Sequence, residues 1–163
     1  MNIKALTVLI TVIFSTTSFA RCEYDLKNIK SVLNALAVKG SVEGVETTIL
    51  RGDDDGYGED RVYTFTKKNS TTWTSSPLSN DTCHAPDCHG NYLHRIKSGC
   101  LLVDGKKVKI LRTTKKVLSY ETPMNREQYE RITLKLLDDG YVDRVQKTYL
   151  DYRLDYTEMF IGR

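Results

Sequence analysis

The sequence predicts an α+β fold, in which an N-terminal helix packs on a mostly antiparallel β-sheet built from hairpins. Two observations predict it: a helical spacing of apolar residues over 23–39, and short β-favouring runs separated by turn dipeptides from residue 42 onward. A third observation, an even number of cysteines behind an export signal, indicates a single disulfide-braced domain over residues 21–163.

Residues 1–20 are expected to be a signal peptide. Lys4 supplies a positive charge, Ala5 to Phe14 form an apolar core of ten residues, and Ala20 ends a polar segment with a small residue at the cleavage position. The core is shorter than the roughly 18 apolar residues of a transmembrane helix, and no later stretch approaches that length. We therefore expect an exported protein, periplasmic or extracellular, without a transmembrane segment.

The chain that follows residue 20 is close to electrically neutral. Removing the signal takes one lysine from the formal charge of +3 and leaves +2. A near-neutral chain is not a bulk binder of polyanions, so no nucleic-acid partner is expected, and any anionic ligand would need a local basic patch.

Residues 23–39 predict one helix. Their apolar positions fall on one helical face: Leu26, Ile29, Val32, Leu33 and Leu36. Asp25 is placed to cap the first turn, and Gly40 is placed to end the last one.

The remainder predicts strands joined by tight turns. The β-favouring runs are Glu46 to Leu50, Arg61 to Lys67, Thr71 to Ser75, Leu101 to Val103, Val108 to Arg112, Val117 to Tyr120, Ile132 to Leu137, and Tyr141 to Leu150. Asp104-Gly105 and Asp139-Gly140 each separate two runs, which favours hairpins. Residues 126–137 are open to a second interpretation, a helix that begins at Arg126, because their periodicity does not decide between helix and strand.

Residues 83–100 contain three of the four cysteines and every histidine. In an oxidising compartment the expected state is two disulfides, Cys22 with Cys100 and Cys83 with Cys88. One alternative is a metal site formed by His84, His89 and His94. Another is haem, because Cys83 and Cys88-His89 spell C-x4-C-H, which is similar to the c-type attachment motif. Disulfides are favoured because an oxidised sulfur is a poor ligand, so no metal or cofactor is expected.

A basic segment is the candidate partner-binding site. Six cations lie within eleven positions: Lys106, Lys107, Lys109, Arg112, Lys115 and Lys116. Val108 and Ile110 alternate with two of the lysines, which predicts a strand with one apolar and one basic face. The structural interpretation is an edge strand protected by lysines. The functional interpretation is a docking face for an acidic partner, either a protein or an anionic component of the cell envelope.

The sequence contains no common catalytic motif: it lacks G-x-S-x-G, H-E-x-x-H and a phosphate-binding glycine loop. The leading hypothesis is a small exported, non-enzymatic binding protein, for which inhibition or neutralisation of another protein is one fitting use. The alternatives are a metal- or haem-binding protein built on residues 83–100, and a hydrolase with paired carboxylates.

Overall fold

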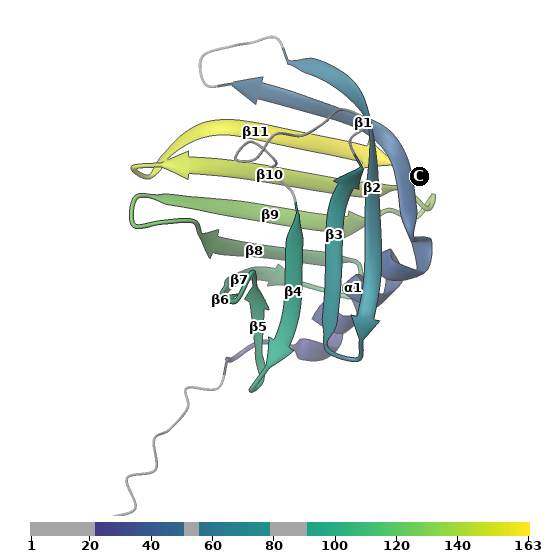
Figure 1. The fold of residues 1–163 in the computed structure, drawn as a ribbon, viewed down its shortest axis with the longest axis vertical. Helices are drawn as coiled ribbons and strands as arrows, with labels where there is room; N and C mark the ends of the chain where they lie inside the picture. The colour runs from purple at the N-terminus through teal and green to yellow at the C-terminus, as the bar shows by residue number, and fades with distance from the viewer. Residues whose placement is uncertain (1–21, 51–55, 79–90) are drawn as a thin grey trace, which may run out of the picture.

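The computed structural model describes residues 22–50, 56–78 and 91–163, and over these residues the chain forms one helix and one antiparallel sheet of eleven strands (Figure 1). The elements are α1 (Leu26–Lys39), β1 (Ser41–Leu50), β2 (Tyr57–Asn69), β3 (Thr72–Leu78), β4 (Tyr92–Lys97), β5 (Cys100–Val103), β6 (Lys106–Lys107), β7 (Lys109–Thr113), β8 (Val117–Pro123), β9 (Gln128–Leu136), β10 (Val142–Leu150) and β11 (Arg153–Gly162). In the described part of the chain, the helix is too short and too polar to cross a membrane.

The sheet curls into a nearly closed barrel. Its strand order is β6-β5-β4-β3-β2-β1-β11-β10-β9-β8-β7, so the two edge strands are neighbours in sequence, separated only by Val108. The edges are also tied together, because Lys106 Nζ donates hydrogen bonds to the carbonyl groups of Pro123 and Met124 at 2.9 and 2.8 Å. Pro123 ends β8, which is the neighbour of the edge strand β7. These hydrogen bonds therefore link the β6 edge of the sheet to the region of the β7 edge.

The predicted α+β architecture, an N-terminal helix packed on a mostly antiparallel sheet of hairpins, is therefore wrong, because the strands form a nearly closed barrel. Each strand run that the sequence predicts overlaps a strand of the structure, and residues 126–137 contain β9 rather than a second helix. Three strands were missed: β4, β6 and β11. The omission of β11 decides the architecture, because β11 pairs with both β1 and β10 and so joins the N-terminal and C-terminal strands into one curled sheet. Strand alternation reports which face is buried, and it is the same for an open sheet and for a barrel.

The predicted helix is confirmed. Asp25 accepts a hydrogen bond from the backbone N–H of Lys27 at 2.8 Å, and Gly40 follows the last turn with a φ of 72°, which glycine adopts without steric cost. Helix α1 contacts β2 and also the adjacent pair β8 and β9, which is far from β2 in the strand order. A helix that reaches strands on different sides of a curled sheet lies across its opening, and we conclude that α1 covers one end of the barrel.

The expected disulfide between Cys22 and Cys100 is present, with the two Cα atoms 5.2 Å apart. It fixes the segment before α1 to β5, and the hydroxyl of Tyr24 accepts a hydrogen bond from the backbone N–H of Leu101 beside it. Cys83 and Cys88 lie outside the described residues, so their pairing stays a prediction.

A pair of glycines sets the close approach of β1 and β11, and this yields a test of the register. Gly44 and Gly162 are cross-strand partners, and a Cβ on Gly44 would lie 2.2 Å from the carbonyl oxygen of Ile161. We predict that Gly44→Ala lowers the free energy of unfolding, measured in urea, by about 1–3 kcal/mol, because backbone must move to accept the methyl group. Gly58→Ala is the control, since the nearest atom to its Cβ is a side-chain methyl of Val45 at 3.2 Å. Equal effects of the two substitutions would contradict this pairing.

Candidate functional site

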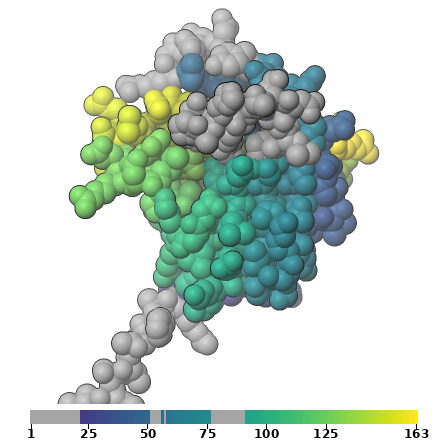
Figure 2. Space-filling view, in the orientation of Figure 1, coloured from purple at the N-terminus to yellow at the C-terminus, as the bar shows by residue number. Residues whose placement is uncertain are grey.

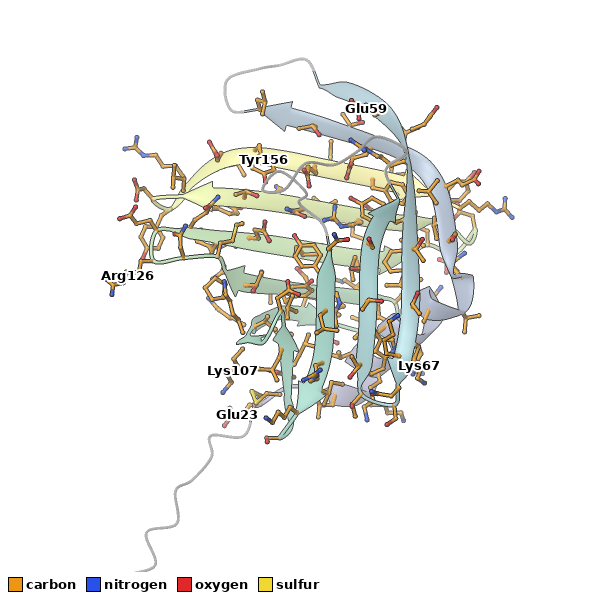
Figure 3. The ribbon with its side chains drawn as sticks, in the orientation of Figure 1. Glu23, Glu59, Lys67, Lys107, Arg126 and Tyr156 are labelled. Carbon is orange, nitrogen blue, oxygen red and sulfur yellow. A yellow bond between two sulfur atoms is a disulfide. The ribbon has the colours of Figure 1, made fainter. Side chains whose placement is uncertain are left out.

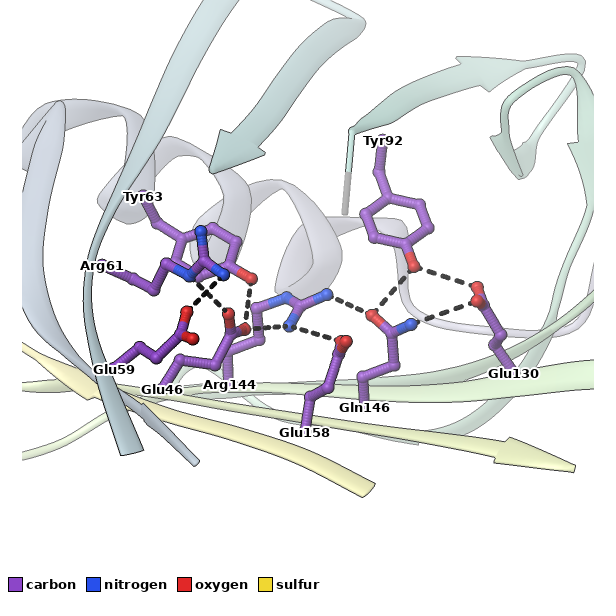
Figure 4. Close-up of polar contacts among 9 residues, drawn as sticks. All are labelled: Glu46, Glu59, Arg61, Tyr63, Tyr92, Glu130, Arg144, Gln146 and Glu158. Carbon is purple, nitrogen blue, oxygen red and sulfur yellow. Dashed lines mark hydrogen bonds and ion pairs between the residues drawn. The ribbon is translucent and has the colours of Figure 1, made fainter. Parts of the chain in front are cut away.

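The barrel interior contains a polar cluster that is visible only in three dimensions. Inward positions of six strands bring together Glu46, Tyr63, Tyr92, Glu130, Arg144, Gln146 and Glu158, which we call the interior cluster (Figure 4). Arg144 and Gln146 follow one another at alternate positions of β10 and are 1% and 0% exposed. Alternation in a strand sends both side chains to the same face, which here is the barrel interior.

Arg144 is the centre of the interior cluster. Its Nη1 lies 3.7 Å from Glu46 Oε1 and 3.9 Å from Glu158 Oε2, and its guanidinium group lies over the ring of Tyr63 at 4.9 Å. Its Nη2 donates a hydrogen bond to Gln146 Oε1. Burial by itself lowers the pKa of Arg144, but the surrounding hydroxyl and carboxylate groups outweigh it, so the pKa is raised and the side chain remains a cation.

The other members of the interior cluster are hydrogen-bonded to one another. Tyr92 donates to Glu130 Oε2 and contacts Gln146 Oε1, both at 2.9 Å, and Gln146 Nε2 donates to Glu130 Oε1 at 3.1 Å. Tyr63 donates to Glu46 Oε1 at 2.6 Å. Burial raises the pKa of both tyrosines, so their hydroxyl groups stay protonated and act as donors.

This arrangement resembles a structural network more than a reaction centre. A carboxylate-pair hydrolase needs one carboxyl group that stays protonated and a second that is charged. Glu46 and Glu158 instead share the cation Arg144, and Glu130 accepts two hydrogen bonds. The interior cluster therefore gives the hydrolase alternative little support.

His94 is the one candidate metal ligand that the structure describes. Its side chain is 1% exposed, and its Nε2 lies 2.9 Å from the hydroxyl oxygen of Tyr120. Within the described residues no group of three or more metal-ligating side chains gathers. The other two proposed ligands, His84 and His89, lie outside the described residues, as do Cys83 and Cys88 of the haem interpretation.

The predicted basic segment divides into three parts. Lys107 and Lys109 are exposed on either side of the buried Val108 and line a groove of about 480 Å³. Lys106 is used in closing the barrel, and Lys116 pairs with Asp138. Arg112 and Lys115 are exposed but do not line this groove.

The groove lies outside the barrel, between the β6–β7 crossing and two hairpins. We call it the outer groove and define it by six of its lining residues: Lys107, Lys109, Arg126, Tyr129, Arg131 and Tyr152. Figure 2 shows the β8–β9 and β10–β11 hairpins projecting side by side from the barrel, in green and yellow. Figure 3 labels Lys107 and Arg126 on this side of the molecule and Lys67 on the other.

Strand register explains how charge gathers on the sheet face beside the outer groove. Lys109 is the cross-strand partner of Glu121, which is the partner of Arg131, which is the partner of Lys147. Arg131 Nε pairs with Glu121 Oε2 at 2.9 Å, so this row contains three cations for one anion. Like charges directly opposite one another destabilise a sheet, so the opposed Arg131 and Lys147 lower the stability of this sheet.

Tyrosines form the second row of this face. Tyr129 and Tyr149 are cross-strand partners whose rings stack with centroids 4.7 Å apart and planes 5° apart. The guanidinium of Arg131 lies 5.5 and 4.9 Å from the two ring centroids, and the ring of Tyr152 lies 6.2 Å from Tyr129.

Arg126, Tyr129 and Arg131 were not predicted from the sequence as site residues. A signal for two of them was present, because Tyr129 and Arg131 alternate with Glu130 and Ile132, as residues on one strand face do. That signal was obscured by the charge of Glu130, which points inward in the structure and is 3% exposed.

The buried imidazole of His94 gives a pH-dependent prediction. Burial, with a smaller effect from the cation Arg144, lowers the pKa of His94 from 6.5 to about 4. Below pH 6.5 the unfolded chain therefore binds a proton that the folded protein does not bind until about pH 4, so stability falls across this interval. We predict that His94 contributes about 3 kcal/mol to the loss of unfolding free energy between pH 6.5 and 4. The measurement is urea unfolding of wild type and His94→Gln across this range, and two parallel curves would contradict the prediction.

Comparisons with known proteins support the fold and leave the function open. No family model matches the sequence, and no curated protein matches it. One similar solved structure is a protein of unknown function from the DUF3598 family of Nostoc punctiforme PCC 73102, with a TM-score of 0.56 and 16% sequence identity. The alignment covers 80% of this chain and 48% of the other, so this chain spans about half the length of that protein.

Proposed function

We propose that this chain is an exported, non-enzymatic binding protein that takes an anionic partner at the outer groove. The observation that carries the proposal is a set of three cations, Lys107, Lys109 and Arg126, that line one concave surface. Within the described residues none of the three forms a salt bridge. Unpaired cations that converge on a groove attract anions and increase the rate at which they associate.

The barrel suits this role because it holds the groove rigidly. Val108 is 4% exposed and its backbone N–H donates to the carbonyl of Leu101, which anchors the chain between the two exposed lysines. Arg131 is held by Glu121, and the tyrosines beside it are stacked. A site whose side chains are fixed before binding loses less conformational entropy when a partner arrives.

Export is supported by the Cys22–Cys100 disulfide, because such bonds persist in oxidising compartments. A non-enzymatic role is supported by the interior cluster, whose described acids are paired with Arg144 or hydrogen-bonded. Inhibition or neutralisation of an acidic protein is compatible with the outer groove, and so is capture of an anionic envelope component.

Charge reversal in the outer groove tests the proposal. We predict that Lys107→Glu combined with Lys109→Glu slows association with an immobilised anionic partner at low salt by about tenfold or more, with a shallower dependence on ionic strength. Both lysines are exposed, but Lys109→Glu places a second carboxylate opposite Glu121, so the free energy of unfolding should fall by about 1 kcal/mol at most and the variant should remain folded. The measurement is surface binding to a panel of an acidic polysaccharide, an acidic protein and anionic lipid vesicles.

The matched control is Lys67→Glu combined with Lys68→Glu, which makes the same charge change at exposed positions near the β2–β3 turn (Figure 3). This control should bind nearly as well as wild type. Equal losses of association rate in the two variants would indicate a general effect of net charge. If the groove variant associates as fast as wild type, its lysines serve only to protect the sheet edge and the proposed binding site is wrong.

A further inference from the structure

The tip of the β10–β11 hairpin combines backbone strain with an exposed aromatic side chain. Leu150 and Arg153 are cross-strand partners, so the loop consists of Asp151 and Tyr152 alone. Their φ angles are 48° and 62°, both in the left-handed region. Two-residue hairpin loops of this kind favour asparagine or aspartate followed by glycine, because only glycine adopts a positive φ without steric cost.

Tyr152 occupies the position that favours glycine. A bulky residue with a positive φ is strained and persists where the rest of the structure holds it in place. The tyrosine gains little packing in return, because it is 86% exposed. Its ring lies beside Tyr129 and lines the outer groove. Backbone strain at a position whose ring is exposed indicates that this ring contacts a binding partner.

The polar lining of the outer groove narrows the chemistry of that contact. Besides the cations, the groove contains the carboxylates of Glu121 and Glu127 and the side-chain amide of Gln128. Glu121 already pairs with Arg131, which leaves the carboxylate of Glu127 and the amide of Gln128 to meet a ligand. The side chains of an acidic peptide offer these groups no donor, whereas the hydroxyl groups of an acidic saccharide donate to them while its anionic groups pair with lysine and arginine.

From this geometry we infer that the outer groove binds an acidic oligosaccharide, with the apolar face of a sugar ring on Tyr152 and Tyr129. The carboxylate or sulfate groups of the saccharide pair with Lys107, Lys109 and Arg126. Tyrosine suits such a role because it offers a large rigid surface with a polar end. This inference rests on the proposed function and specifies its ligand.

The test uses calorimetric titration with a short oligogalacturonate. Its methyl ester, which has the same sugar rings without charge, and an oligoglutamate of equal charge are the comparison ligands. The oligogalacturonate should bind at least about tenfold more tightly than either, because it alone offers the ring and the charge together. Equal binding of the oligoglutamate would overturn the saccharide assignment and favour a protein partner.

Substitutions at Tyr152 separate the ring from the strain. Tyr152→Gly should weaken oligogalacturonate binding by about five- to tenfold, as expected for loss of one stacking contact. The same substitution should raise Tm by roughly 2–5 °C, because glycine adopts the positive φ freely. Tyr152→Phe keeps the ring and should bind nearly as wild type does.

The outcomes distinguish the two proposals. If Tyr152→Gly binds the oligogalacturonate as tightly as wild type, the saccharide inference is wrong. If the groove lysine variant still loses binding to another member of the anionic panel, the proposed function stands without it. If no anionic ligand binds the wild-type protein at low salt, both proposals fail.

Discussion

The buried charge of Arg144 is the constraint on which the rest of the structure depends. An unpaired guanidinium in a protein interior costs several kcal/mol, so its compensation must be supplied by the fold. Glu46 on β1, Glu158 on β11 and Gln146 on β10 supply it, and the rings of Tyr63 and Tyr92 on β2 and β4 complete it. Because β4 and β10 are far apart in the strand order, one side chain reaches both only when the sheet is curled. The buried charge therefore favours the barrel over a flat sheet.

Alternation along β9 and β10 separates stability from recognition. Inward residues such as Glu130 and Gln146 are paired with one another. Outward residues of the same strands, Arg131 and Tyr149, form the face beside the outer groove. A substitution on one face therefore leaves the other face largely unchanged, and the outer groove can vary in ligand while the barrel is preserved. The strained Tyr152 extends this division to the hairpin tip, where folding alone would favour glycine.

Local features of the fold could be predicted from the sequence, and its closure could not. The cap at Asp25 and the turn at Asp139-Gly140 depend on neighbouring residues, and both are as expected. Strand β11 was missed because its inward face contains Tyr156 and Glu158, so its alternation is not apolar against polar. Two of the six defining residues of the outer groove were predicted, since Lys107 and Lys109 lie in one run, whereas the other four come from hairpins that only the barrel brings alongside.

The most direct test of this division is an NMR titration of the isotopically labelled wild-type protein with oligogalacturonate. If the outer groove binds the ligand and the interior cluster serves the fold, the shifted amides should belong to residues 107–109, 125–131 and 151–153. The amides of Arg144 and His94, in the interior, should stay in place. Shifts centred on Arg144 and its partners, with the hairpin tips unchanged, would show that the ligand enters the barrel and would contradict the outer groove as the binding site.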